Sequence, residues 1–225
     1  MRKRVGTIMK VLITGEHLPV LTVNLDSKDI IFTENDVTTI SLMSPDIKKE
    51  TISTAKRLNP FFSKLIFGDA KVLDQYTATK AESVMAFSAP LPGQIVTLNI
   101  TKSKPIVIKK GSLIAFSKGI SINPRKKFNL WDAFFGNDDL ALQVLSGQGT
   151  AYILVDKDAK TYTLTKGKAL SFDQAAVAYM DASMTLMVKR TNIFKAFFFG
   201  GNDVIKYKVT GPGKIVTQNA NYQRM

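Results

Sequence analysis

Three Phe-Gly dipeptides recur at nearly equal spacing along this sequence. They are Phe67-Gly68, Phe135-Gly136 and Phe199-Gly200, separated by 68 and 64 residues. Such a period predicts a unit repeated three times, in which each copy buries its apolar face against the others rather than alone. We therefore expect one compact domain made of three repeats, at residues 18–90, 91–155 and 156–220.

A short apolar segment precedes each of these glycines. The positions six, two and one residues before the glycine are apolar in every copy: Phe62, Ile66 and Phe67; Leu130, Phe134 and Phe135; Phe194, Phe198 and Phe199. Side chains four residues apart lie on one face of a helix, and glycine commonly follows a helix end. The spacing predicts one short helical turn, packed on the core, in each repeat.

Strand-like segments and turn signals fill the rest of each repeat. Gly147-Gln148-Gly149 and Gly211-Pro212-Gly213 separate such segments, because glycine accepts the backbone angles of a tight turn. The first repeat has Thr79-Lys80-Ala81 at this place, so a looser connection is expected there. Apolar and polar residues alternate along segments such as 21–26. Many short, evenly spaced strands favour an all-β fold of the sandwich or barrel kind.

Composition narrows the class of protein. The 225 residues include no cysteine, which excludes disulfides and thiolate metal sites and favours a reducing compartment. Lys10 interrupts the apolar run near the N-terminus, and no segment approaches the roughly 20 apolar residues that cross a bilayer. We expect a cytoplasmic protein.

The net charge of +13 is the one unusual bulk property. It allows two interpretations: ordinary solubility, or an anionic partner such as RNA or an anionic membrane surface. The lysines are spread along the chain, and the local clusters are short. The candidate anion-binding residues are Lys109, Lys110, Arg125, Lys126, Lys127, Lys189 and Arg190.

The sequence offers little for catalysis or metal binding. His17 is the single histidine and has no partner ligand nearby, so a zinc site is not expected. The Gly211-Pro212-Gly213-Lys214 segment lacks both the spacing and the following helix of a phosphate-binding loop. We therefore predict no catalytic residue, no metal, no cofactor and no small-molecule substrate.

Two features point to an interface. Trp131 and Phe134 lie in the second aromatic segment, where core or interface packing is more typical than base stacking. Leu142 and Val144 occupy positions that hold lysine in the third repeat, so this strand is apolar on both faces. We expect a neighbouring repeat or a second subunit to cover it.

The end of the chain resembles a known family. Phe198-Phe199-Gly200-Gly201, followed by the segment from Val209 to Gln218, is similar to the closing signature of the family of altered inheritance of mitochondria protein 24. The motif residues are Phe199, Gly200, Gly211, Pro212, Gly213 and Gln218. The resemblance implies three tandem β-sandwich modules about a pseudo-threefold axis, a fold related to the tryptophan RNA-binding attenuation protein. It also implies homo-oligomers, with a trimer favoured, and no catalytic residues.

Together these observations predict a non-enzymatic assembly or scaffold protein of the cytoplasm. The alternative is a binding module for RNA or an anionic membrane surface, which would act through the positive charge.

Overall fold

The computed structural model describes residues 9–34, 39–53, 72–124, 142–173, 177–190 and 205–219. Within these ranges the chain forms nineteen β-strands and no helix, so the predicted all-β class is confirmed. The three predicted helical turns, with Trp131 and Phe134, lie outside the described residues.

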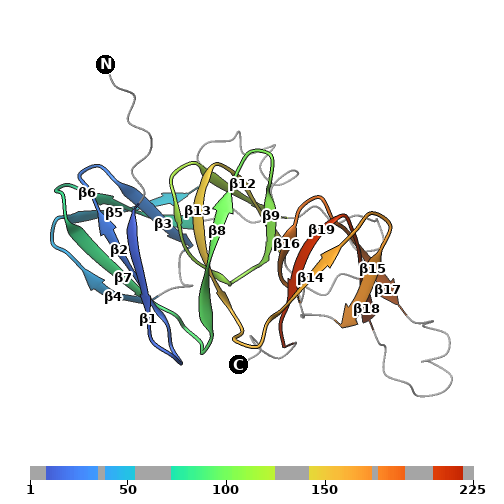
Figure 1. The fold of residues 1–225 in the computed structure, drawn as a ribbon. Coiled ribbons are helices and arrows are strands. Elements are labelled where there is room, and N and C mark those ends of the chain that lie inside the picture. Colours follow the sequence, from blue (N-terminus) through green and yellow to red (C-terminus); the bar gives the residue numbers. More distant parts are fainter. Residues whose placement is uncertain are drawn as a thin grey trace. The chain divides into compact units, whose positions relative to one another are not determined.

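The strands form four sheets, which we number 1 to 4 (Figure 1). Sheet 1 has the order β1 (Lys10–Thr14), β2 (Val20–Leu25), β7 (Ser83–Ser88), β4 (Thr39–Met43). Sheet 2 has the order β5 (Ile47–Ser53), β6 (Val72–Ala78), β3 (Ile30–Glu34), β10 (Leu113–Ser117), β13 (Gly149–Val155), β8 (Gln94–Ile100).

Sheets 3 and 4 contain the remaining strands. Sheet 3 has the order β11 (Ile120–Pro124), β12 (Leu142–Gly147), β9 (Ile106–Lys109), β16 (Val177–Asp181), β19 (Gly213–Thr217), β14 (Lys160–Leu164). Sheet 4 has the order β15 (Ala169–Asp173), β18 (Ile205–Thr210), β17 (Thr185–Arg190).

The sheet orders repeat with a period of six strands. Adding six to each strand number of sheet 2 gives the order of sheet 3, so the repeating sets are β2–β7, β8–β13 and β14–β19. A register shift also recurs at the same place in each set, between Ile40 and Leu42, Leu113 and Ala115, and Val177 and Tyr179. The arrangement of the three sets about a pseudo-threefold axis stays a prediction, as do the repeat boundaries at 18–90, 91–155 and 156–220.

Apart from the last residues of β8 and β13, sheets 1 and 2 belong to one compact unit and sheets 3 and 4 to another. In the first unit, strand alternation buries Leu21, Val23 and Leu25 on one face of β2, as the sequence predicts. The sheets meet where the rings of Tyr76 on β6 and Phe87 on β7 pack in a T-shaped arrangement, with centroids 6.4 Å apart.

The second unit has its own hydrophobic core. Residues of sheet 3, such as Met180 and Ile215, pack there with Leu186, Tyr207 and Val209 of sheet 4. Within sheet 4, Phe172 stacks on its cross-strand neighbour Tyr207 at a centroid distance of 6.2 Å. Each unit is thus held together by apolar faces of two sheets.

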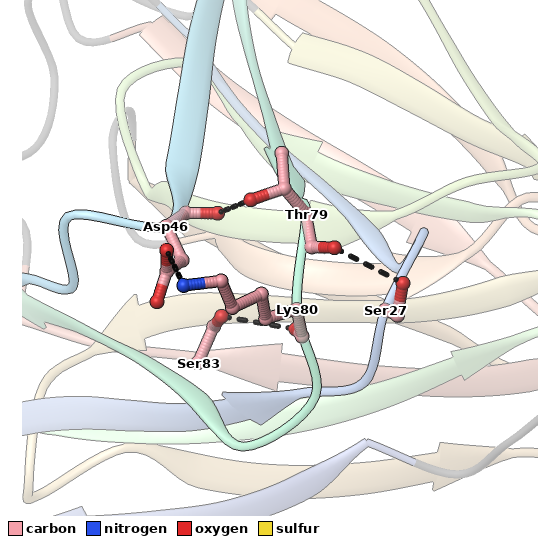
Figure 2. A network of polar contacts seen from close by, with 5 residues as sticks. All are labelled: Ser27, Asp46, Thr79, Lys80 and Ser83. Carbon is pink, nitrogen blue, oxygen red and sulfur yellow. Dashed lines mark hydrogen bonds and ion pairs between the residues drawn. The ribbon is translucent and has the colours of Figure 1, made fainter.

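The turn between β6 and β7 differs from its counterparts, as the sequence predicts. It contains four residues, 79–82, whereas Gln148 alone separates β12 from β13. Figure 2 shows how hydrogen bonds hold this longer turn: Thr79 Oγ1 donates to the Asp46 carbonyl at 2.7 Å, and Ser27 Oγ donates to the Thr79 carbonyl at 3.2 Å. Lys80 Nζ also pairs with Asp46 Oδ1 at 2.9 Å. The connection is therefore longer but anchored to two neighbouring turns.

Candidate assembly surface

Sheet 1 has apolar residues on both faces. Its buried face carries Met85 and Phe87, whereas Leu12 and Leu42 are 58% and 55% exposed. The register places Leu12 opposite Thr22, Thr22 opposite Ala86 and Ala86 opposite Leu42, so one cross-strand row contains both leucines. We call Leu12, Thr22, Ala86 and Leu42 the sheet 1 row. The two leucines lie at the ends of the row, on the outer strands β1 and β4, with Thr22 and the buried Ala86 between them. Exposed large apolar side chains of this kind make the outer face of sheet 1 a candidate interaction surface.

Sequence reasoning missed this row, although a signal was present. Ile40, Leu42 and Met43 are apolar positions on both sides of the register shift in β4, and Met43 is 43% exposed. The same criterion, an apolar strand on both faces, identified Leu142 and Val144 in the second repeat. The register shift hides the pattern in β4, because it breaks the simple alternation of faces.

Within a single chain the structure buries Leu142 of β12 and partly buries Val144. Leu142 belongs to the core cluster of the second unit, next to Val107 and Met180, and Val144 packs against that cluster. Parts of the same chain therefore pack on this strand, and a contact with a second subunit stays a prediction.

Four of the seven predicted anion-binding residues lie in the described part of the chain. Lys109 ends β9 and is half-buried, and Lys110 is exposed in the turn that follows. Lys189 and Arg190 end β17, opposite Lys206 and Ile205. Arg125, Lys126 and Lys127 lie outside the described residues, so a common basic face stays a prediction.

Two glycines of the family motif sit where no side chain fits. A Cβ atom on Gly211 would lie 2.6 Å from the carbonyl oxygens of Leu164 and Thr165, and one on Gly213 would lie 2.6 Å from Met184 Cγ. Pro212 lies between them in the β18–β19 turn, whereas Phe199 and Gly200 lie outside the described residues. Gly211 is approached by backbone atoms, whereas Gly213 is approached by the Met184 side chain and has a φ of +148°, a conformation that glycine adopts easily.

Gln218, the last motif residue, holds a connection in place. It is buried directly after β19, and its Oε1 accepts a hydrogen bond from the backbone N–H of Asp156 at 3.3 Å. This bond links the end of β19 to the turn before β14. In the described part of the motif, Gly211 and Gly213 therefore shape a turn and Gln218 holds a connection.

A buried carboxylate on β6 was not predicted from the sequence. Asp74 Oδ2 pairs with Lys49 Nζ at 2.9 Å, and Asp74 Oδ1 accepts a hydrogen bond from Thr51 Oγ1 at 2.7 Å. Burial alone would raise the pKa of Asp74, but the bonds from Lys49 and Thr51 hold this pKa below its ordinary value. The bond to Asp74 raises the pKa of Lys49, despite some desolvation. Lys49 Nζ also lies 5.8 Å from the centre of the Tyr76 ring.

This pair predicts a loss of stability in acid. Because the folded-state pKa of Asp74 is lowered, its contribution is present above the unfolded pKa of about 3.9 and is lost as pH falls through the folded value. We expect Asp74→Asn to reduce the free energy of unfolding by about 1–2 kcal/mol at pH 7, since Lys49 is 46% exposed and partly screened. Urea unfolding at pH 7 and pH 3 should show this difference shrinking in acid.

The exposed pair Lys80–Asp46 supplies the matched control. Its side chains are 72% and 37% exposed, so Asp46→Asn should change stability little at either pH. An undiminished difference between Asp74→Asn and the original protein at pH 3 would show that the charge of Asp74 is not the cause.

The described residues hold no group of three or more histidine, cysteine, aspartate or glutamate side chains that could bind a metal ion. In that same part of the chain, no helix is long and apolar enough to span a membrane.

The fold and the site together define a class: an all-β protein built from repeated sets of strands, in which the described signature residues shape a turn and a connection. Residues 11–220 match the family described as mitochondrial biogenesis AIM24, and the chain belongs to that family. The predicted family resemblance is therefore confirmed.

The fold also occurs in a solved structure. The X-ray structure of protein SPYM3_0169 from Streptococcus pyogenes is similar, with a TM-score of 0.70 and 17% sequence identity over 94% of each chain. At this identity the likeness concerns the fold alone. No curated protein matches the chain.

Proposed function

We propose that this protein is a non-enzymatic assembly protein that works as a homo-oligomer. The observation that supports the proposal most directly is the sheet 1 row, which leaves Leu12 and Leu42 more than half exposed on the outer face of a sheet. Covering such residues removes apolar surface from water, which stabilises the complex by about 25 cal/mol for each Å² buried. Membership of the mitochondrial biogenesis family is compatible with a role in organisation.

A cytoplasmic location belongs to the same proposal and is supported by the absence of cysteine from all 225 residues. Binding of RNA or an anionic membrane remains the alternative, and the net charge of +13 is its main support.

Light scattering coupled to gel filtration tests the assembly. We expect the purified chain to have a mass of at least twice 24.8 kDa. Leu42→Lys should lower that mass, because a lysine on an edge strand opposes association. Thr161→Lys is the matched control, since it adds the same charge at an exposed position of β14 in the other unit. A single-chain mass for the unmodified protein would refute the proposal.

A further inference from the structure

The two six-stranded sheets are joined at the same point. In sheet 2, β3 of the first strand set pairs with β10 of the second; in sheet 3, β9 of the second set pairs with β16 of the third. The registers are Phe32 opposite Phe116 and Ile31 opposite Ser117 in the first junction, and Ile108 opposite Tyr179, Val107 opposite Met180 and Ile106 opposite Asp181 in the second. Each junction thus pairs the second strand of one set with the third strand of the next.

Sheets 1 and 4 contain the two halves of this junction separately. The third strand of the first set is β4, and the second strand of the third set is β15. Among the described residues, β4 pairs with β7 alone and β15 with β18 alone, so each has an open edge. An open edge presents unpaired N–H and C=O groups that can bind another strand.

Exposure of side chains follows the same pattern. Leu42 and Met43 of β4 are 55% and 43% exposed, and Ala169 and Ser171 of β15 are exposed as well. The corresponding residues of β10, Ala115 and Phe116, are buried where that strand pairs with β3. The apolar residues of β4 are therefore those that a neighbouring strand covers elsewhere in the chain.

We propose that β15 of one copy of this protein pairs antiparallel with β4 of a second copy, head to tail. The three strands of sheet 4 and the four strands of sheet 1 would then form one seven-stranded sheet. This inference rests on the proposed assembly function and names its partner and its contact. The partner is a second copy because the two open edges are the complementary halves of a junction that this chain already forms twice.

The internal junctions also define the register. The shared register shift aligns Met43 with Phe116 and Met180. The second strand of each set, β3, β9 or β15, also pairs within its own set with β6, β12 or β18. These equivalent pairings align Ser171 with Phe32 and Val107. Both junctions therefore place Met43 opposite Ser171. The same alignment puts Leu42 opposite Phe172, so Leu42 would extend the apolar surface around the stacked Phe172 and Tyr207 rings.

Disulfide capture tests this register, and the chain has no cysteine to interfere. Directly opposed residues of antiparallel strands have Cα atoms about 4.5–5.5 Å apart, within the range that a disulfide spans. We expect co-expressed Met43→Cys and Ser171→Cys chains to give a two-chain band on a non-reducing gel after mild oxidation. Either variant alone should remain single chains, because a head-to-tail contact does not bring two identical positions together.

Co-expression of Met43→Cys with Met187→Cys is the matched control. Met187 is 50% exposed but lies on β17, at the opposite edge of sheet 4, so little coupling is expected. Equal coupling in this control would mean random collision and would overturn the inference. The double variant Met43→Cys/Ser171→Cys should form ladders of several chains; a disulfide confined to one chain would also overturn it.

The outcome separates this inference from the proposed function. If no disulfide forms between chains while light scattering still reports an oligomer, the proposed strand contact is wrong but the proposed assembly is retained. A single-chain mass would remove both.

Discussion

Replacing Gly211 with alanine is expected to lower the free energy of unfolding by about 2–3 kcal/mol. The new Cβ would lie 2.6 Å from two backbone oxygens, those of Leu164 and Thr165, and 2.8 Å from Leu164 Cβ. Leu164 ends β14 and Thr165 accepts a hydrogen bond in the turn that follows, so their backbone atoms cannot move aside as a flexible side chain can, and the β18–β19 turn must shift away. Thermal unfolding should shift down by about 5–10 °C.

Gly167→Ala is the matched control for this prediction. Gly167 has a φ of +80°, but a Cβ there would meet nothing within 4 Å. The expected loss is the conformational strain alone, about 1 kcal/mol. Equal losses for the two variants would show that close approach at Gly211 is unimportant.

Replacing Phe87 with alanine is expected to cause the largest loss of stability, about 3–5 kcal/mol. Phe87 is fully buried between sheets 1 and 2, and its ring packs in a T-shaped arrangement with the Tyr76 ring. The substitution would leave a cavity between two sheets whose strands cannot collapse far. Chemical denaturation followed by circular dichroism measures the loss.

Leu12→Ala is the matched control within sheet 1, because its side chain is 58% exposed. We expect a change within about 0.5 kcal/mol when the protein is dilute enough to be dissociated. A loss at Leu12 similar to that at Phe87 would contradict the assignment of the two faces of sheet 1.

The all-β class was predictable because strand alternation is a local property. Leu21, Val23 and Leu25 are separated by residues that face the other side of the sheet, and the structure buries these three on one face. The glycines of the β18–β19 turn were also recognisable, since a turn imposes backbone angles that few residues accept. The aromatic segments before the Phe-Gly dipeptides lie outside the described residues, so their predicted helical turns stay predictions.

The candidate surface was not predictable in the same way. The sequence places Leu142 on a strand with two apolar faces, whereas the register shift in β4 hides the same pattern around Leu42. In the structure Leu142 joins the core of the second unit, whereas Leu42 remains exposed on an edge strand. The difference depends on which strands lie beside them, and that information is absent from either segment. The pairing of the buried Asp74 with Lys49 was missed for the same reason, since the two residues lie 25 positions apart on different strands.

By itself, the sequence indicated a unit repeated three times, the all-β class, the turns that contain glycine and the family. Each of these depends on residues close together in the chain, where spacing and backbone preference carry the information. Only the tertiary structure decided that a sheet is shared between successive sets of strands, as where Phe116 pairs with Phe32. Such a pairing joins residues 84 positions apart through backbone hydrogen bonds, which any side chain permits, so no local pattern specifies it.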